Sequence, residues 1–91
     1  MRVTNHAVNR WRERTGSKHA DEKIRVKIRG MVDAGEEMEM KKKFRVLALI
    51  DHRFDDAKYI RGKNGMIFVV VNDTVVTIHN GRADRWERKQ M

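Results

Sequence analysis

Residues 66–79 read MIFVVVNDTVVTIH, and this stretch decides the fold. Met66 to Val71 is a nearly continuous apolar run, which predicts a strand at a central position in a sheet. Asn72 and Asp73 follow the run and suit a tight hairpin. The next residues, 74–79, predict the partner strand, with Thr77 and His79 on one face by period-2 alternation.

Two amphipathic helices are predicted upstream of this hairpin. The first spans residues 5–14, with Thr4 or Asn5 as its N-cap and Gly16 ending it in a left-handed conformation. Its apolar stripe consists of Val3, Ala7, Val8 and Trp11. The second helix spans residues 21–34, and its core-facing stripe consists of Ile24, Ile28, Met31 and Val32.

The period changes from helical to alternating after Gly35, which suits the end of the second helix. Met38 and Met40 alternate with charged residues and predict an edge strand. Further strands are predicted at 44–50 and 59–61, a loop at 51–58 and a turn at 62–65. Residues 81–91 are expected to form a polar C-terminal tail or a short helix. The chain as a whole, residues 1–91, is predicted to be one α+β domain in which two N-terminal helices cover an antiparallel meander of about four strands.

Composition bounds the class of protein. The chain has 91 residues, no cysteine, a formal net charge of +8 and a pI near 10.3. Without cysteine, neither a disulfide framework nor a thiolate metal site can form. The first residues lack the apolar core of a secretory signal, and the longest apolar run is too short to span a bilayer. We therefore expect a soluble cytoplasmic protein with no membrane partner.

Basic side chains are concentrated in two parts of the sequence. Residues 1–29 carry nine basic and three acidic side chains, and residues 41–45 contribute Lys41, Lys42, Lys43 and Arg45. Basic patches attract polyanions and speed their encounter. The sequence therefore predicts RNA or another nucleic acid as the partner, and the alternative is an ordinary solvated surface.

His6, Arg10 and Arg14 recur at four-residue spacing within the first predicted helix. This spacing places three side chains on one face of a helix. An imidazole moves a proton near neutral pH, and guanidinium groups hold phosphate oxygens bidentately. The row therefore indicates a site for a phosphate ester that needs no metal. In the plainer interpretation, His6 is a capping or surface residue and the arginines form ion pairs on the surface.

The pattern HAxxRxxxR at residues 6–14, followed by a second helix and a last strand containing VVTI at 75–78, resembles a known family. It is similar to short domains grouped with RelE-type and colicin-type ribonucleases, a toxin-like class. The resemblance implies N-terminal helices packed on an antiparallel sheet of about four strands. It also implies metal-independent RNA cleavage by histidine, arginine, lysine or tyrosine side chains. Similar proteins often end the last strand with tyrosine, and this chain has His79 there.

Metal-independent RNA cleavage needs a base for the 2′-hydroxyl, an acid for the departing 5′-oxygen and cations facing the phosphate. We assign proton transfer to His6 and His79 and phosphate binding to Arg10 and Arg14. Further contacts to the nucleic acid are expected from Lys42, Lys43, Arg82, Trp86 and Thr77. Trp86 lies among basic residues and suits base stacking, and its alternative role is to pin the tail to the domain.

No cofactor and no metal are expected. The stretch at residues 51–56, DHRFDD, combines carboxylates with an imidazole, but its composition is that of an ordinary loop. Two functions remain open. One is a small RNA-directed protein acting as a metal-independent endoribonuclease. The other is a non-catalytic accessory or regulatory module, of the kind phages encode, that binds nucleic acid or a protein partner or inhibitor.

Overall fold

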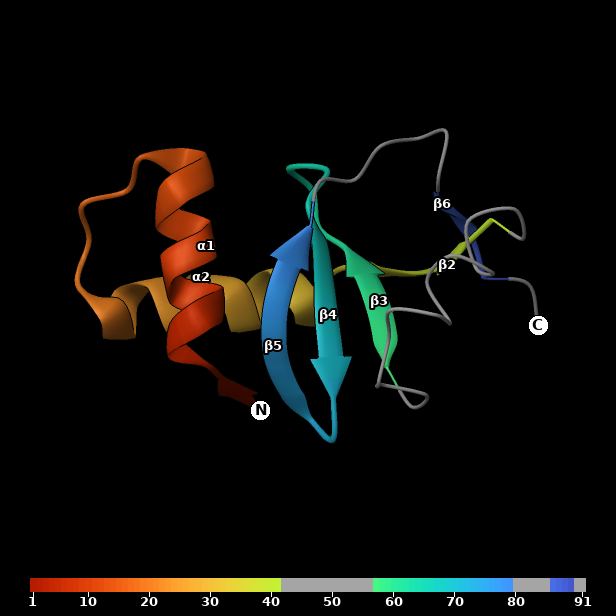
Figure 1. Cartoon of the computed structure of the whole chain (residues 1–91), viewed down its shortest axis with the longest axis horizontal. Coiled ribbons are helices and arrows are strands. Elements are labelled where there is room, and N and C mark those ends of the chain that lie inside the picture. The colour runs from red at the N-terminus through yellow and green to blue at the C-terminus, as the bar shows by residue number, and fades with distance from the viewer. Residues whose placement is uncertain (42–56, 80–85, 90–91) are drawn as a thin grey trace.

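The computed structural model describes residues 1–41, 57–79 and 86–89, which form an α+β fold (Figure 1). The predicted strand at 44–50 and most of the loop at 51–58 lie outside these residues. Within the described ranges, the elements in chain order are β1 (Arg2–Val3), α1 (Asn5–Thr15), α2 (Asp21–Asp33), β2 (Glu36–Met40), β3 (Lys58–Arg61), β4 (Ile67–Val71), β5 (Thr74–His79) and β6 (Trp86–Arg88).

The described strands form one six-stranded sheet in the order β1-β5-β4-β3-β2-β6. Neighbouring strands are antiparallel except β1 and β5, which run parallel and make the sheet mixed. This sheet is wider than the antiparallel one of about four strands expected from the sequence. The two outer strands have two and three residues, which is too short for any sequence period to show.

The β4–β5 hairpin confirms the prediction from residues 66–79. Asn72 and Asp73 both have positive φ, 49° and 59°, which is the type I′ arrangement that matches the twist of the strands. β4 lies between β3 and β5, and its first four residues are 7% exposed or less. The register of the hairpin shifts between Val69 and Val70, so that Val76 has no partner on β4.

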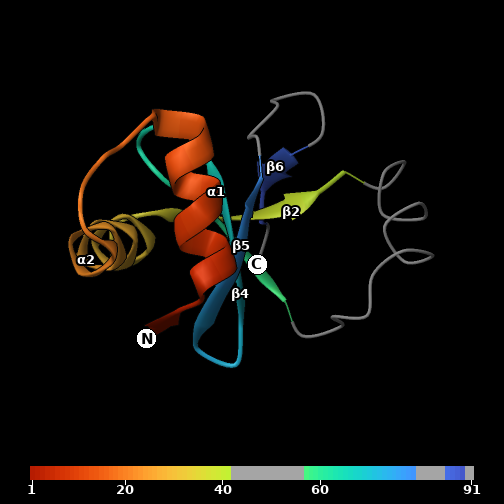
Figure 2. The ribbon, with the colours of Figure 1, turned by 60° about the vertical axis from the view of Figure 1, so that its left-hand side comes forward.

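Both helices lie on one side of the sheet, as Figure 2 shows where α2 is seen end-on beside α1. Thr4 caps the start of α1, where its side chain accepts a hydrogen bond from the Ala7 amide, and Gly16 caps the end with φ 68°. The main core joins both helices to the sheet and contains Val3, Ala7, Val8, Trp11, Ile24, Ile28, Val32, Phe68, Val70, Val75 and Ile78. Neither described helix has the length and apolarity needed to cross a bilayer.

Gly35 does not end α2 in the way predicted. The C-cap is Ala34 in a right-handed conformation, so no left-handed glycine terminates this helix. A Cβ at Gly35 would lie 2.4 Å from the Ile60 Cγ2 atom and 2.8 Å from the Arg61 carbonyl oxygen. Gly35 is therefore required because β3 approaches the backbone closely at this point.

The C-terminal residues correct two expectations. Trp86–Arg88 form strand β6 rather than a tail or a helix, and β6 pairs with β2, so β2 is not an edge strand of the described sheet. Two ion pairs hold the strands together, Arg88 Nε to Glu36 Oε1 at 2.7 Å and Lys89 Nζ to Glu37 Oε2 at 2.9 Å. Trp86 anchors β6 in a second, smaller core with Met38 and Ile67, against which Tyr59 packs.

Candidate nucleic-acid interface

The face of α1 that packs against the sheet determines where the basic side chains of the helix lie. Ala7, Val8 and Trp11 are buried against the sheet. Since each residue turns the helix by about 100°, a four-residue step drifts by about 40°. His6, Arg10 and Arg14 therefore form a diagonal row, in which Arg14 is half-buried beside the core and Arg10 and His6 are exposed.

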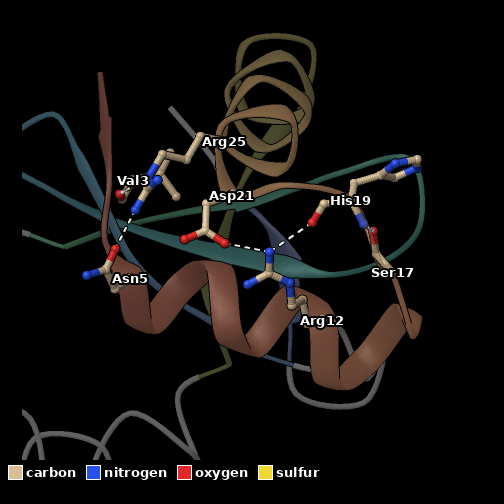
Figure 3. A network of polar contacts seen from close by, with 7 residues as sticks. All are labelled: Val3, Asn5, Arg12, Ser17, His19, Asp21 and Arg25. Atoms are coloured by element: carbon tan, nitrogen blue, oxygen red, sulfur yellow. Dashed lines mark hydrogen bonds and ion pairs between the residues drawn. The ribbon is translucent and has the colours of Figure 1, made fainter.

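A network of polar contacts fixes the opposite side of α1 against α2 (Figure 3). The Arg12 Nη2 atom lies 2.5 Å from an Asp21 carboxylate oxygen and donates a hydrogen bond of 2.8 Å to the His19 carbonyl. At the start of α1, Arg25 donates to the Val3 carbonyl at 3.2 Å and to the Asn5 side chain.

These contacts give Arg12 and Arg25 a structural role. On a helical wheel, Arg10 lies about 160° from Arg12. The row of His6, Arg10 and Arg14 therefore occupies the side of α1 that faces away from α2.

Arg10 is held in place only weakly by its ion pair with Glu13. Its Nη1 atom lies 3.4 Å from Glu13 Oε2, and both side chains are largely exposed, at 44% and 63%. An exposed ion pair of this kind contributes about 0–1 kcal/mol and weakens with salt. A phosphate can therefore compete with Glu13 for the Arg10 guanidinium.

Strand β5 supplies the second group of predicted residues, Thr77 and His79. Thr77 is half-buried and His79, the last residue of the strand, is exposed. Thr77 pairs with Val69 and His79 with Ile67 across the hairpin. Directly paired residues project from the same face of a sheet, so Thr77 and His79 share one face, as expected.

The start of α1 is tied to the middle of β5. The Thr4 amide donates to the Val75 carbonyl at 3.0 Å, and the Thr4 hydroxyl donates to the Val76 carbonyl at 3.1 Å. From there α1 and β5 run side by side in the same direction (Figures 1 and 2).

His6 and His79 are consequently offset along this direction. His79 follows Val76 by three residues, or about 10 Å of strand. The same rise takes about seven residues of helix. His79 therefore lies level with the part of α1 that contains Arg10 and Arg14, beyond the level of His6.

The remaining predicted residues have different outcomes. Lys42, Lys43 and Arg82 lie outside the described residues, as does the stretch at 51–56. Trp86 is 6% exposed, and its ring centroid lies 4.9 Å from that of Tyr59. This packing corresponds to the alternative role of Trp86, in which it pins the C-terminal residues to the domain.

Tyr59 and Arg61 on β3 are functional candidates that the sequence analysis did not single out. The sequence places both in a short strand, but only the strand register shows that they share a face with Thr77 and His79. Burial raises the pKa of the Tyr59 phenol above its usual value of 10.0. The hydroxyl is therefore protonated at neutral pH and can donate a hydrogen bond.

A groove of about 560 Å³ lies on the helix side of the sheet, and none of the predicted site residues lines it. Its lining includes the apolar side chains of Val32, Ile60 and Val70 and the charged side chains of Asp33, Glu37, Asp73 and Lys58. The three carboxylates outnumber the one lysine and disfavour a phosphate ligand. Among the described residues, no three histidine, aspartate or glutamate side chains are grouped so as to hold a metal ion.

Comparisons with known proteins found no matching family model, no matching curated protein and no matching solved structure.

Proposed function

We propose that this protein binds RNA along the edge formed by α1 and β5 and cleaves it there without a metal ion. The observation that carries the proposal is that α1 and β5 lie side by side. The row of His6, Arg10 and Arg14 faces away from α2, and His79 ends β5 at the level of the two arginines. His79 projects from the face of the sheet opposite α1, so RNA would have to pass around the end of β5 to meet both the imidazole and the two guanidinium groups, which suit a phosphodiester.

The proposed reaction is an internal transesterification. A base takes the proton of a ribose 2′-hydroxyl, and the 2′-oxygen forms a bond to phosphorus while the bond to the 5′-oxygen breaks. An acid gives a proton to the departing 5′-oxygen, so the products are a 2′,3′-cyclic phosphate and a 5′-hydroxyl. His79 and His6 are the proposed proton carriers, and Arg10 and Arg14 hold the phosphate oxygens.

A RelE-like fold is part of this proposal. Two N-terminal helices on one side of the sheet, with β2, β3, β4 and β5 as antiparallel neighbours, support it. The parallel strand β1 and the added strand β6 are features that the expected four-stranded sheet lacks.

Binding without cleavage is the second candidate, because the two histidines are offset. An acid and a base acting on one phosphate have to reach two oxygens of the same phosphodiester. The offset between the two histidines is about 7 Å, since His79 lies about 10 Å along β5 from the contact at Thr4 and His6 about 3 Å along α1, and it disfavours a direct approach of both rings to one phosphate. The basic row on α1 would still bind nucleic acid, or an acidic surface of a protein partner.

The test is incubation of the purified protein with total RNA in EDTA, followed by analysis of the fragment ends. We expect discrete cuts ending in cyclic phosphate, reduced about 10²–10⁴-fold in His79→Ala and in His6→Ala. His19→Ala is the matched control, because His19 is exposed on the α1–α2 connection and its hydrogen bonds with Arg12 and Ser17 use the His19 backbone atoms.

The outcomes separate the two candidates. Intact RNA, together with salt-dependent binding that Arg10→Ala weakens, would establish the binding module. Cuts that persist equally in His6→Ala and His79→Ala would refute the assigned catalysis. A wild-type protein that neither cuts nor binds RNA would refute the proposed function.

A further inference from the structure

The side of α2 that faces away from the sheet carries a row of four exposed residues, which we call the outer row. They recur at alternating steps of three and four, and they are Lys23, Val26, Gly30 and Asp33. Such steps keep positions on one side of an α-helix. The opposite side of α2 packs into the core through Ile24, Ile28 and Val32. Since α2 lies at the margin of the molecule (Figure 2), the outer row is accessible to a second molecule.

Val26 and Gly30 form the middle of the outer row. Val26 is 56% exposed, more than any other large hydrophobic residue in the described part of the chain. A Cβ at Gly30 would meet no described atom within 4 Å, so no described residue packs over this position. A glycine at a helix surface lets a second helix approach closely, and its approach would remove Val26 from water.

The two ends of the outer row carry opposite charges and are placed symmetrically. Lys23 and Asp33 are each five residues from Ile28, and Val26 and Gly30 are each two residues from it. An antiparallel copy of the same helix therefore sets Lys23 against Asp33 and Val26 against Gly30. Each contact then occurs twice, as in any interface with two-fold symmetry. Alternating steps of three and four are also the spacing of residues at the contact between helices that cross at about 20°.

The charges beside the outer row are compatible with this pairing. Arg29 lies on one side of the row, and its guanidinium is 3.2 Å from Glu22 of the same helix. Lys27 lies on the other side, where it is exposed and can extend its amine into solvent. At the end of the row, Asp33 also lines the groove in which carboxylates outnumber lysine. A protein with a net charge of +8 thus has local negative charge where the Lys23 end of a second copy would lie.

We propose that two copies of this protein associate through α2, packed antiparallel about a two-fold axis beside Ile28. Lys23 of each copy lies against Asp33 of the other, and Val26 of each copy lies over Gly30 of the other. One helix per copy makes a small interface, so the dimer belongs to the weak, transient class. The inference does not rest on the proposed function, and because the row of His6, Arg10 and Arg14 faces away from α2, both copies keep that row accessible.

The test is sedimentation equilibrium of the full chain at low salt over a series of protein concentrations up to about 1 mM, which detects weak association. The average mass of the wild type should rise from 10.8 kDa toward twice that value. Lys23→Glu and Asp33→Lys, each made alone, should raise the Kd of the dimer about tenfold or more, because each places like charges together at two points. The double variant Lys23→Glu with Asp33→Lys restores opposite charges and should dimerise nearly as the wild type does.

Two features keep the test specific. Lys63→Glu is the matched control, because it makes the same change in net charge at an exposed residue outside α2, and it should not weaken the dimer. Neither single variant is expected to unfold α2, since an acidic residue near the start of a helix and a basic residue at its end both interact favourably with the helix dipole. Circular dichroism of each variant checks that the fold is retained.

Recovery of the dimer in the double variant, after its loss in both single variants, supports the proposal. A wild-type protein that remains monomeric over the whole concentration range overturns it. A dimer that persists equally in both single variants also overturns it, because the contact then lies on another surface. RNA cleavage or binding by a monomeric protein would leave the proposed function standing while this proposal fails.

Discussion

Replacing Gly35 by alanine is expected to destabilise the protein through overpacking. The added Cβ would lie 2.4 Å from Ile60 Cγ2, 2.8 Å from the Arg61 carbonyl oxygen and 2.9 Å from the Met31 carbonyl oxygen. The Ile60 methyl group can move, but the two carbonyl oxygens belong to the backbones of β3 and α2. Relief therefore requires the strand and the helix to separate, at a cost of about 1–3 kcal/mol.

Gly30→Ala is the matched control, because it makes the same chemical change five positions earlier on α2. A Cβ at Gly30 meets nothing within 4 Å, and Gly30 lies inside the helix. Alanine there should stabilise the protein by roughly 0.5–1 kcal/mol, since glycine loses more backbone entropy on folding. The two substitutions are thus predicted to have opposite signs.

Thermal and urea denaturation followed by circular dichroism measures both effects. For a domain of this size, 1 kcal/mol shifts the Tm by about 4–8 °C. Gly35→Ala should therefore lower the Tm by about 4–24 °C, and Gly30→Ala should raise it by about 2–8 °C, with unchanged urea m-values. A Tm for Gly35→Ala at or above that of the wild type would refute the close approach of β3 to the end of α2.

Two further predictions concern single side chains. Tyr59 is the only tyrosine in the chain, so its tyrosinate absorbance reports one group, and burial should place its pKa above that of a free tyrosine. Because the pKa of Tyr59 is higher in the folded than in the unfolded protein, its contribution to the free energy of unfolding is complete below pH ~10 and is lost as the pH rises through the folded pKa. Tyr59→Phe should therefore make the free energy of unfolding fall less steeply at high pH. Arg12→Ala should lower the Tm because it breaks the contacts with Asp21 and His19. Arg10→Ala should change the free energy of unfolding by no more than about 0.5 kcal/mol and should lower the affinity for RNA instead. Equal effects of the two arginine substitutions on the Tm would contradict the assigned roles.

The elements that could be predicted from the sequence are those with local signals. Residues 66–79 contain a long apolar run and two turn-forming residues, and the hairpin confirms the prediction. The ends of α1 were likewise predictable, because Thr4 and Gly16 act on backbone atoms of the adjacent turns. Signals of this kind need no knowledge of tertiary contacts.

The outer strands depend on their partners and could not be predicted. Val3 was expected on the stripe of the first helix, but it belongs to β1 and pairs with Val75, far away in the sequence. Trp86 was expected in a tail, and β6 forms because its indole packs against Tyr59 and the strand pairs with β2. Neither contact leaves a periodic pattern in so few residues.

The candidate site likewise combines features with a local sequence signal and features that depend on tertiary contacts. The spacing of His6, Arg10 and Arg14 is a local property, and α1 indeed carries all three. The level of His79 relative to this row depends on how far a helix and a strand each rise per residue, starting from the shared contact at Val76. The position of His79 relative to α1 therefore depends on tertiary contacts, which the local sequence pattern does not reveal.

The unpaired Val76 decides which side of the sheet carries the polar end of β5. Val75 and Ile78 both face the helices, although they are three residues apart, an odd number that strict alternation forbids. If β5 instead alternated strictly through Val76, with no bulge, its two surfaces beyond Val75 would be exchanged. Ile78 would then turn outward, and Thr77 and His79 would enter the core. The single extra residue of the bulge thus keeps both Val75 and Ile78 in the core, while the imidazole of His79 remains at the surface.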